Sequence, residues 1–396
     1  MREPANGLAG PRPLPRIAFG AQCHRSYGQG VVRGVLDYVR SHGPWEFRYR
    51  RQGAVDRRTL ARPGGVHGVI TQRMDDATSR LVRRRGLPTV LVEADDSAFA
   101  KVIPDDRAIG RMAFEYFRAQ GFRRFAYFTN AVARFSIDRF EGLLGGAVAL
   151  GCVCRASHTE KPETAWDRVA RKAWLRTLEP PTALLVISSD TGRDVLLDLH
   201  DLGFAVPDDI AVLSSENDEI ASGLTWPNLS GIDINTRRIG YLAAELLDRM
   251  MHGDAIPEEA VRIAPNRVVS RASSDTYAVD DDRLRAALLF IRDHACEGAT
   301  VRDVLRRVPV CRRTLEVAFQ RRLGRTVHQE IVRVRLREAR RLLAETDLPM
   351  PDVAVRCGYE HASNLSQVFR RELGRTPTSY RRQHRGLDWS GRPVLP

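Results

Sequence analysis

Apolar and polar positions follow two different patterns along the chain, and the first extends to about residue 270. Six apolar runs predict β-strands at residues 16–21, 66–71, 88–93, 123–129, 182–188 and 210–215. Between them lie segments with the apolar spacing of an amphipathic helix, such as 108–121 and 237–253. Strands separated by helices predict parallel β-α-β units and a doubly wound sheet. About 250 residues is long for one such sheet, so we expect two α/β lobes.

The second pattern, from about residue 280, contains helices alone. We expect helices within 279–298, at 301–307, 312–323 and 327–345, from Pro351, at 363–373, and from Pro377. Capping boxes, in which side chains bond the free N–H groups of a helix start, are predicted at Thr300 and Thr326. Gly324 and Gly374 are placed to end the third and sixth of these helices.

These patterns divide the chain into domains. We expect an α/β domain at 16–270, a linker at 271–282, an all-α domain at 283–385, and tails at 1–15 and 386–396. The first tail is rich in Pro and Gly and lacks the apolar segment of a signal peptide. No apolar run approaches the roughly 18 residues of a membrane-spanning helix. We therefore expect a cytoplasmic protein with no membrane partner.

The all-α part contains an internal repeat. "LEVAFQRRLGRT" at 315–326 and "LSQVFRRELGRT" at 365–376 share seven of twelve positions. Each copy belongs to a short helix, a turn and an amphipathic helix, which is a helix-turn-helix arrangement. The predicted helix between the copies spans about 28 Å at ~1.5 Å per residue, and successive major grooves of B-DNA lie ~34 Å apart. We therefore predict two recognition helices that enter adjacent grooves on one face of DNA.

Charge supports a nucleic-acid partner. Residues 281–396 hold 24 Arg and 14 acidic residues, whereas residues 1–280 hold 38 Lys and Arg and 35 acidic residues. The all-α part therefore carries +10 of the net charge of +13. Such asymmetry is typical of a polyanion-binding module attached to a near-neutral one. Charge alone does not distinguish DNA from RNA or a membrane surface.

Helical spacing assigns roles within the two copies. Leu315, Phe319 and Leu323 share the packing face of the first helix, and Leu365, Phe369 and Leu373 share that of the second. The remaining positions of each helix face outward or flank this packing side. We expect base contacts from Arg312, Arg313, Glu316, Val317, Ser363, Asn364 and Gln367. We expect phosphate contacts from Arg321, Arg370, Arg371, Arg375 and Arg381. The alternative is a pair of surface helices with solvated charges, which does not explain the recurrence of the same packing set.

Polar side chains follow the predicted strands of the α/β part, at the sheet edge where ligands usually bind. They include Gln22, Tyr27, Gln72, Arg73, Glu93, Ser189, Asp190, Glu216 and Asn217, with Asp105 and Arg139 in similar stretches. Carboxylates, amides and a guanidinium suit a polyhydroxylated ligand, because each hydroxyl both donates and accepts a hydrogen bond. For any one of these residues, a place in a surface loop is an equally good interpretation.

No catalytic or metal-binding motif is present. Gly28-x-Gly30-x-x-x-Gly34 begins too far past the first strand for a dinucleotide loop, and the six cysteines are scattered. We expect no cofactor, no metal and no enzymatic activity. These observations favour a DNA-binding protein that also binds a polyhydroxylated ligand. One alternative is an α/β sugar-processing enzyme with a DNA-binding tail, which turnover of the sugar would reveal. Another is a DNA-binding protein that binds no sugar.

The α/β part resembles the LacI/GalR-type, periplasmic-binding-protein-like (type I) fold, in which sugar binds between two lobes. The resemblance rests on "VIPDDRAIGRMAFEYFRAQGFRRFAYF", "PDDIAVLSSENDE" and "LSGIDINTRRIGYLAAELLDRMMHG". It implies a sensor with sugar contacts from Asp105, Arg139, Ser189, Asp190, Glu216 and Asn217. Position 189 is more often Asn or Thr in that family and position 216 is usually Asp, so the pocket is reshaped here.

The all-α part resembles the AraC/XylS family, whose DNA-binding domain holds two helix-turn-helix motifs. "RVRLREARRLL" matches the linker helix of that domain, and "GRTPTSYR" matches its usual ending. The combined resemblance implies a transcriptional activator that binds a double-stranded operator, works with RNA polymerase and forms homodimers. It also implies a monosaccharide effector, with D-xylose or a related aldose as the expected ligand.

Overall fold

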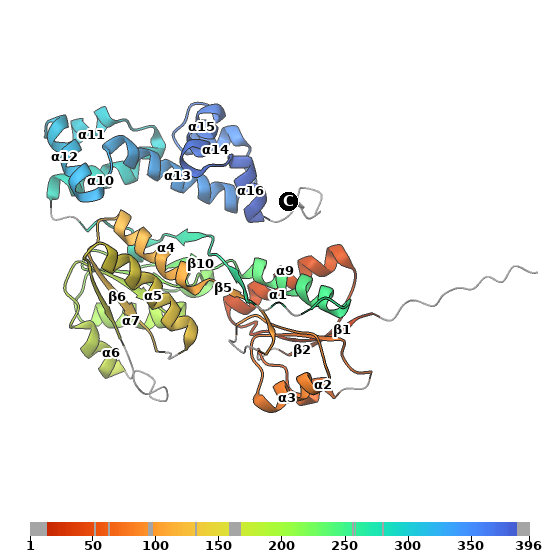
Figure 1. Ribbon diagram of the computed structural model, residues 1–396. Coiled ribbons are helices and arrows are strands. Elements are labelled where there is room, and N and C mark those ends of the chain that lie inside the picture. The colour runs from red at the N-terminus through yellow and green to blue at the C-terminus, as the bar shows by residue number, and fades with distance from the viewer. Residues whose placement is uncertain are drawn as a thin grey trace, which may run out of the picture.

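Two six-stranded sheets and a helical domain make up the computed structural model (Figure 1). It describes residues 14–50, 53–61, 64–93, 98–130, 133–157, 168–255, 257, 259–278 and 281–385. Residues 1–13 and 386–396 of the two expected tails lie outside the described residues, as do residues 279–280 of the expected linker.

Lobe 1 is a parallel sheet in the order β11-β5-β4-β3-β1-β2. Its strands are β1 (Arg16–Gly20), β2 (Glu46–Arg50), β3 (Gly68–Thr71), β4 (Thr89–Leu91), β5 (Ala100–Pro104) and β11 (Val261–Ile263). Its helices are α1 (Ser26–His42), α2 (Arg57–Leu60), α3 (Asp76–Arg84) and α9 (Thr236–Met251). Helices α1 and α9 pack in one core with Ile17 and Ile70, whereas Leu60 and Val82 of α2 and α3 pack with Val69 in a second core.

Lobe 2 is a sheet in the order β12-β10-β9-β8-β6-β7, parallel except for the antiparallel pair of β10 and β12. Its strands are β6 (Arg124–Phe128), β7 (Val153–Ala156), β8 (Thr182–Val186), β9 (Ile210–Ser214), β10 (Ser230–Asp233) and β12 (Arg267–Val269). Its helices are α4 (Asp106–Ala119), α5 (Arg134–Ala149), α6 (Arg168–Leu175), α7 (Ser189–Asp201), α8 (Glu219–Gly223) and the 3-10 helix η1 (Ala272–Ser274).

The chain passes between the lobes from β5 to α4, from β10 to α9 and from β11 to β12. All six predicted strands and both quoted helices are confirmed to within a few residues, and the expected pair of lobes is present. The carboxyl ends of the parallel strands therefore lead toward the space between the lobes, where the predicted polar residues follow them.

Glycines allow two helix pairs to cross at very short distance. A Cβ on Gly34 of α1 would lie 1.9 Å from the carbonyl oxygen of Arg237, at the start of α9. A Cβ on Gly110 of α4 would lie 2.0 Å from the carbonyl oxygen of Arg139 on α5. Gly34 thus serves helix packing, and the α4–α5 crossing fixes the backbone of Arg139 against α4.

The helical domain has two cores that share one helix. Its elements are α10 (Asp282–His294), η2 (Ala295–Glu297), α11 (Val301–Arg307), α12 (Arg312–Leu323), α13 (Val327–Glu345), α14 (Met350–Arg356), α15 (Ala362–Leu373) and α16 (Pro377–Arg385). Val327, Ile331 and Val334 of α13 belong to the first core, and Leu336 and Leu342 to the second. A single helix therefore fixes the two halves relative to each other.

The sequence signals of this domain are confirmed. Both capping boxes are present, at Thr300 and Thr326, and Gly324 and Gly374 end α12 and α15 with a left-handed φ of 69° each. Residues 313–330 and 363–380 have the same burial class at every position. The repeat is therefore a repeat of structure as well as of sequence.

Candidate functional site

Arg139 occupies the edge of lobe 2 that faces lobe 1. Its Nε donates to Asp106 Oδ1 at 2.8 Å, and its Nη1 donates to Ser215 Oγ at 2.8 Å and to the carbonyl oxygen of Ile187 at 3.3 Å. The residue is buried, and its guanidinium lies 5.2 Å from the centre of the Phe135 ring. The guanidinium is therefore fixed at the carboxyl ends of β8 and β9, beside the first turn of α4.

Two carboxylates lie near this one guanidinium. Glu216, which follows β9, is half-buried, and its Oε1 accepts the backbone N–H of Ser189 at 3.2 Å. Burial raises the pKa of Glu216 above its usual value, although Arg139 and the Ser189 N–H oppose this effect. Burial likewise raises the pKa of Asp106 despite its bond to Arg139. At both carboxylates, burial therefore outweighs the stabilisation that Arg139 gives to the charged form.

Lobe 1 contributes amide, carboxylate and phenol groups. Gln72 Nε2 donates to Glu93 Oε2 at 2.7 Å, and the Gln72 side-chain oxygen accepts the backbone N–H of Gln22. The Tyr27 hydroxyl donates to the carbonyl oxygen of Val92. Burial raises the pKa of Tyr27, with smaller contributions from Glu93 and from Asp106 of lobe 2. Tyr27 also packs against the cores of both lobes, so it lies between them.

A cavity of about 30 Å³ remains between the lobes, lined by Ser26, Tyr27, Glu216, Asn217, Asp233, Ile234 and Thr236. A cavity of this size is large enough for a water molecule.

Only some of the six predicted ligand residues lie close to one another. Arg139, Ser189 and Glu216 are brought together. Asp105 caps α4 by accepting the Ala108 N–H at 2.9 Å, and Asp190 is exposed, 3.8 Å from Arg193. Asn217 lines the cavity and accepts a hydrogen bond from Arg271 at 2.9 Å.

Sequence reasoning missed Asp106 and Ser215, which bond Arg139 directly. The doublet Asp105-Asp106 was the available signal. Where a helix begins with two acidic residues, one can cap its backbone while the next turns toward a neighbour. The exact start of the helix decides which of the two residues caps it and which contacts the neighbour.

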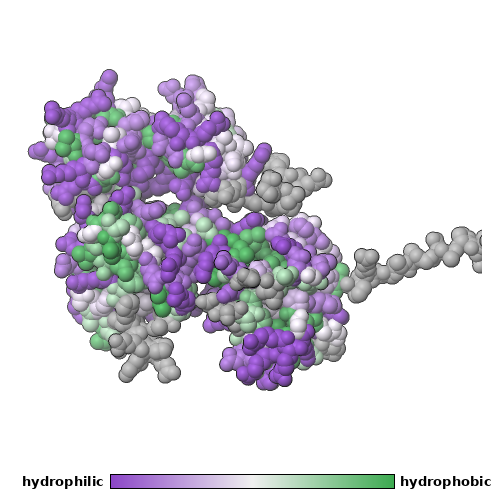
Figure 2. Space-filling model, viewed as in Figure 1, coloured by the Kyte–Doolittle hydropathy of each residue, from purple (hydrophilic) through white to green (hydrophobic). Residues whose placement is uncertain are grey.

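The predicted base-reading residues lie on exposed helix faces. Arg312, Arg313, Ser363, Asn364 and Gln367 are exposed, as is Val317 at 55%. Figure 2 shows that the visible surface of the helical domain is mostly hydrophilic. Exposed guanidinium and amide groups on two helices of the same construction suit contacts to base edges.

Four predicted DNA contacts have partners within the domain. The Glu316 carboxylate accepts the Val327 N–H at 3.3 Å, and the Arg381 side chain donates to the carbonyl oxygen of Leu348 at 2.6 Å. The Arg375 guanidinium lies 5.0 Å from the centre of the Tyr380 ring. Arg321, Arg370 and Arg371 are exposed, with Arg371 paired to its neighbour Glu372 at 2.8 Å.

Clusters of metal ligands and membrane-spanning helices are absent from the part of the chain that the structure describes. No group of three or more His, Cys, Asp or Glu residues there is placed to hold a metal ion. No described helix is long and apolar enough to cross a membrane.

Comparisons with known proteins match this arrangement. Family models match a periplasmic binding protein-like domain at residues 114–274 and a helix-turn-helix domain at residues 304–383. The chain is 28% identical to the xylose operon regulatory protein of Escherichia coli (strain K12) over 381 residues, which cover 92% of this chain and 96% of that protein.

Solved structures give the same result. The structure of the xylose-binding transcription activator xylR is 26% identical, with a TM-score of 0.58, and covers 93% of this chain and 98% of its own. A LacI family transcriptional regulator from Mycobacterium smegmatis, 22% identical with a TM-score of 0.52, shares the fold over 66% of this chain and 99% of its own. The chain therefore belongs with the DNA-binding transcriptional regulators that join a periplasmic-binding-protein-like domain to a C-terminal helix-turn-helix domain.

Proposed function

We propose that this protein is a transcriptional activator controlled by one monosaccharide that binds between its lobes. The observation that carries the proposal is the placement of Arg139 beside Asp106 and Glu216, at the edge of lobe 2 that faces lobe 1. The matched xylose operon regulatory proteins make D-xylose the leading candidate, with a related aldose as the alternative.

The chemistry of the cleft suits a sugar. A sugar hydroxyl donates to a carboxylate and accepts from a guanidinium, so one ring can bridge Glu216 and Arg139. Glu216 extends about one methylene further than the Asp that the family resemblance leads us to expect, and Ser189 is shorter than Asn. We propose that Asp105, Asp190 and Asn217 complete the site when the lobes adjust to the ligand.

The exposed faces of α12 and α15 would bind one double-stranded operator, with the predicted base and phosphate contacts given above. A homodimer would then contact two such sites and recruit RNA polymerase, and the protein would act in the cytoplasm, where DNA and polymerase are found.

The proposal is tested by thermal melts of the full chain with a panel of pentoses and hexoses. A ligand at 100 times its dissociation constant stabilises the native state by ~2.7 kcal/mol. Arg139→Ala should abolish the shift, whereas Arg134→Ala on the exposed side of the same helix should retain it. The sugar should be recovered unchanged, because conversion to a product would instead support an enzyme. If no sugar shifts the wild-type melt, the sensor proposal is wrong.

A further inference from the structure

The segment that joins β12 to α10 is anchored on lobe 2. We call residues 267–278 the strap. Ser273 and Ser274 of the strap are buried. The Ser273 hydroxyl donates to the carbonyl oxygen of Val212 at 2.7 Å, and the Ser274 hydroxyl donates to the hydroxyl of Ser230 at 2.7 Å. Much of the expected linker is therefore an ordered part of the α/β domain.

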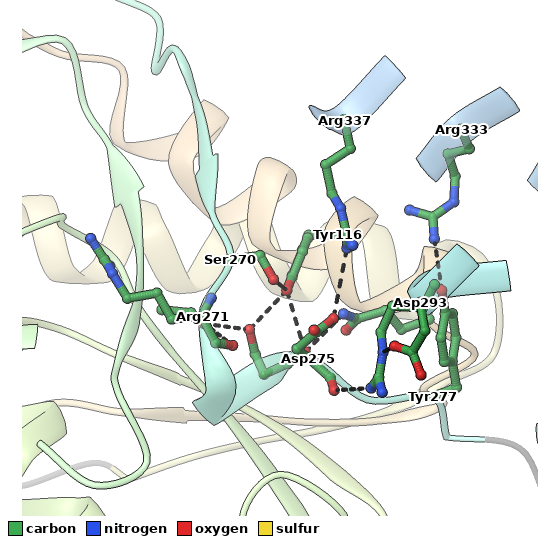
Figure 3. Close-up of polar contacts among 12 residues, drawn as sticks. Tyr116, Ser270, Arg271, Asp275, Tyr277, Asp293, Arg333 and Arg337 are labelled. Atoms are coloured by element: carbon green, nitrogen blue, oxygen red, sulfur yellow. Dashed lines mark hydrogen bonds and ion pairs between the residues drawn. The ribbon is translucent and has the colours of Figure 1, made fainter. Parts of the chain in front are cut away.

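The C-terminal end of α4 is bonded to the strap (Figure 3). The Tyr116 hydroxyl lies 2.7 Å from Ser270 Oγ and 2.8 Å from Ser274 Oγ. Gln120 Nε2 donates to the carbonyl oxygen of Ser274 at 2.8 Å, and the Ala278 N–H donates to the carbonyl oxygen of Gln120 at 2.9 Å. The end of α4 and the strap therefore form one unit.

Glu330 of α13 lies where this unit meets the helical domain. Its fully buried carboxylate accepts from the Tyr277 hydroxyl at 3.2 Å, from Arg333 at 2.6 and 2.9 Å, and from Arg325 Nε. Burial alone would raise the pKa of Glu330, but the two guanidinium groups outweigh it and hold the pKa below its usual value. We call Tyr277, Arg325, Glu330 and Arg333 the Glu330 cluster.

Arg325 holds the two domains together. Besides its bond to Glu330, its Nη2 donates to the carbonyl oxygen of Ala119, the last residue of α4. The helical domain lies over this end of α4 (Figure 1). A weaker contact is the ion pair of Arg337 with Asp275 of the strap, at 3.8 Å (Figure 3). Both contacts join α13 or the turn before it to the unit on lobe 2.

The other ends of α4 and the strap lie at the cleft. Helix α4 begins with Asp106, the partner of Arg139, and its 14 residues extend about 21 Å at ~1.5 Å per residue. In the strap, Arg271 Nη2 donates to Asn217 Oδ1 at 2.9 Å. Asn217 directly follows Glu216 in the chain. Two continuous connections therefore run from the cleft to the Glu330 cluster.

We propose that the Glu330 cluster is the contact through which occupancy of the cleft sets the orientation of the first recognition helix. The proposal rests on the proposed function, since it needs an effector in the cleft. A ligand that takes hydrogen bonds from Arg139 competes with Asp106 and displaces the start of α4. A packed helix moves as a rigid element, so its far end moves too. The cluster follows, because a buried charge is costly to leave unpaired, and α12 ends two residues before Arg325.

The test measures whether sugar and DNA affinities are coupled in the full chain. The DNA is a duplex that the wild-type chain has selected from a random pool, and the sugar is the one that shifts its melt most. In the wild type we expect the sugar to change the dissociation constant for DNA by about 5-fold or more. Arg325→Met should reduce this change to less than about 2-fold while the sugar-induced melt shift remains, because Arg333 still pairs with Glu330.

Arg322→Met is the matched control. It removes the same charge from an exposed neighbour of Arg325 and should keep the wild-type coupling. Full coupling in Arg325→Met, or none in the wild type, would overturn the proposal.

A second measurement needs no sugar. Hydrogen exchange of the amides in the first turn of α4 should change on DNA binding in the wild type and in Arg322→Met, but not in Arg325→Met. The same response in all three proteins would contradict the proposal. A melt without any sugar response would count against the proposed function alone, because this second measurement would still decide the role of the cluster.

Discussion

The cleft and the interdomain contact each hold buried arginine and carboxylate side chains, but the carboxylate pKa values shift in opposite directions. In the cleft, the Arg139 guanidinium bonds Asp106 and lies near Glu216, and burial raises the pKa of both carboxylates. In the interdomain contact, two arginines surround Glu330 alone, and its pKa lies below its usual value. Burial therefore outweighs the guanidinium in the first group, whereas two guanidinium groups outweigh burial in the second.

This difference distinguishes the cleft, a candidate binding site, from the Glu330 cluster, a structural contact between domains. A buried carboxylate whose charged form is disfavoured is stabilised when the hydroxyl groups of a ligand donate hydrogen bonds to it. The Glu330 carboxylate already accepts hydrogen bonds from Tyr277, Arg325 and Arg333. A further donor would add little stability, whereas loss of a present donor would be destabilising. We therefore expect changes in the cleft to alter binding, and changes in the Glu330 cluster to alter stability and coupling.

The largest expected effect is the loss of charge at Glu330. Glu330→Gln leaves two buried arginines without their counter-charge and should cost about 3–5 kcal/mol of unfolding free energy. Glu216→Gln removes a carboxylate whose charged form is already disfavoured, so it should change stability by less than about 1 kcal/mol. Melting temperatures and urea titrations of both variants make the comparison, and equal destabilisation would contradict it.

A break in α13 should separate the two regions. Glu338→Pro removes a hydrogen bond in the middle of α13 and should cost ~3 kcal/mol or more locally. Because both halves of the helical domain share this helix, operator affinity should fall strongly while the sugar-induced melt shift remains. Glu338→Ala is the control and should bind the operator normally. Normal binding by a folded Glu338→Pro variant would refute the role of α13 as a spacer.

Exposed arginines should behave unlike the arginines of the Glu330 cluster. Arg313→Ala and Gln367→Ala should each weaken binding to the selected operator by ~1–3 kcal/mol and affect random DNA far less. Neither change should alter the melting temperature, because both side chains are exposed. Arg370→Ala should instead reduce the salt dependence of binding. An equal loss on both DNAs would argue against base reading by Arg313 and Gln367.

The smallest effect is a pH dependence of opposite sign in the two regions. The pKa of Glu330 is lowered from 4.5, so its contribution to stability is present above about pH 4.5 and is lost as pH falls through the folded pKa. The pKa of Glu216 is raised from 4.5, so protonation on acidification relieves a cost instead. Between about pH 6 and 4, Glu216→Gln should therefore lose stability more steeply than the wild type. An identical profile would contradict the raised pKa.

The helical domain was predicted from sequence nearly to the residue because its signals are local. The bounds of α12 and α13 agree with the prediction, since a capping box and a left-handed glycine are read from neighbouring residues. Strands of the lobes were missed where such signals are weak. β2 alternates charged and aromatic residues, and β11 and β12 have only three residues each.

The sites were predictable only in part. Polar residues after strands pointed to Arg139 and Glu216, because parallel strands end at one edge of a sheet. The Glu330 cluster gave no such signal. Tyr277 lies in the expected linker, 53 residues from Glu330, and the contact of Arg325 with Ala119 depends on how the domains dock. Contacts of this kind follow from tertiary structure and not from any local pattern.

The most direct test of the whole account is a titration of the selected operator with the full chain, followed by fluorescence anisotropy, with and without D-xylose. We predict that the sugar changes the dissociation constant by about 5-fold or more, and that Arg139→Ala removes this dependence while the chain still binds the operator. Specific operator binding that no pentose or hexose alters in the wild type would contradict the claim that the cleft controls the DNA-binding domain.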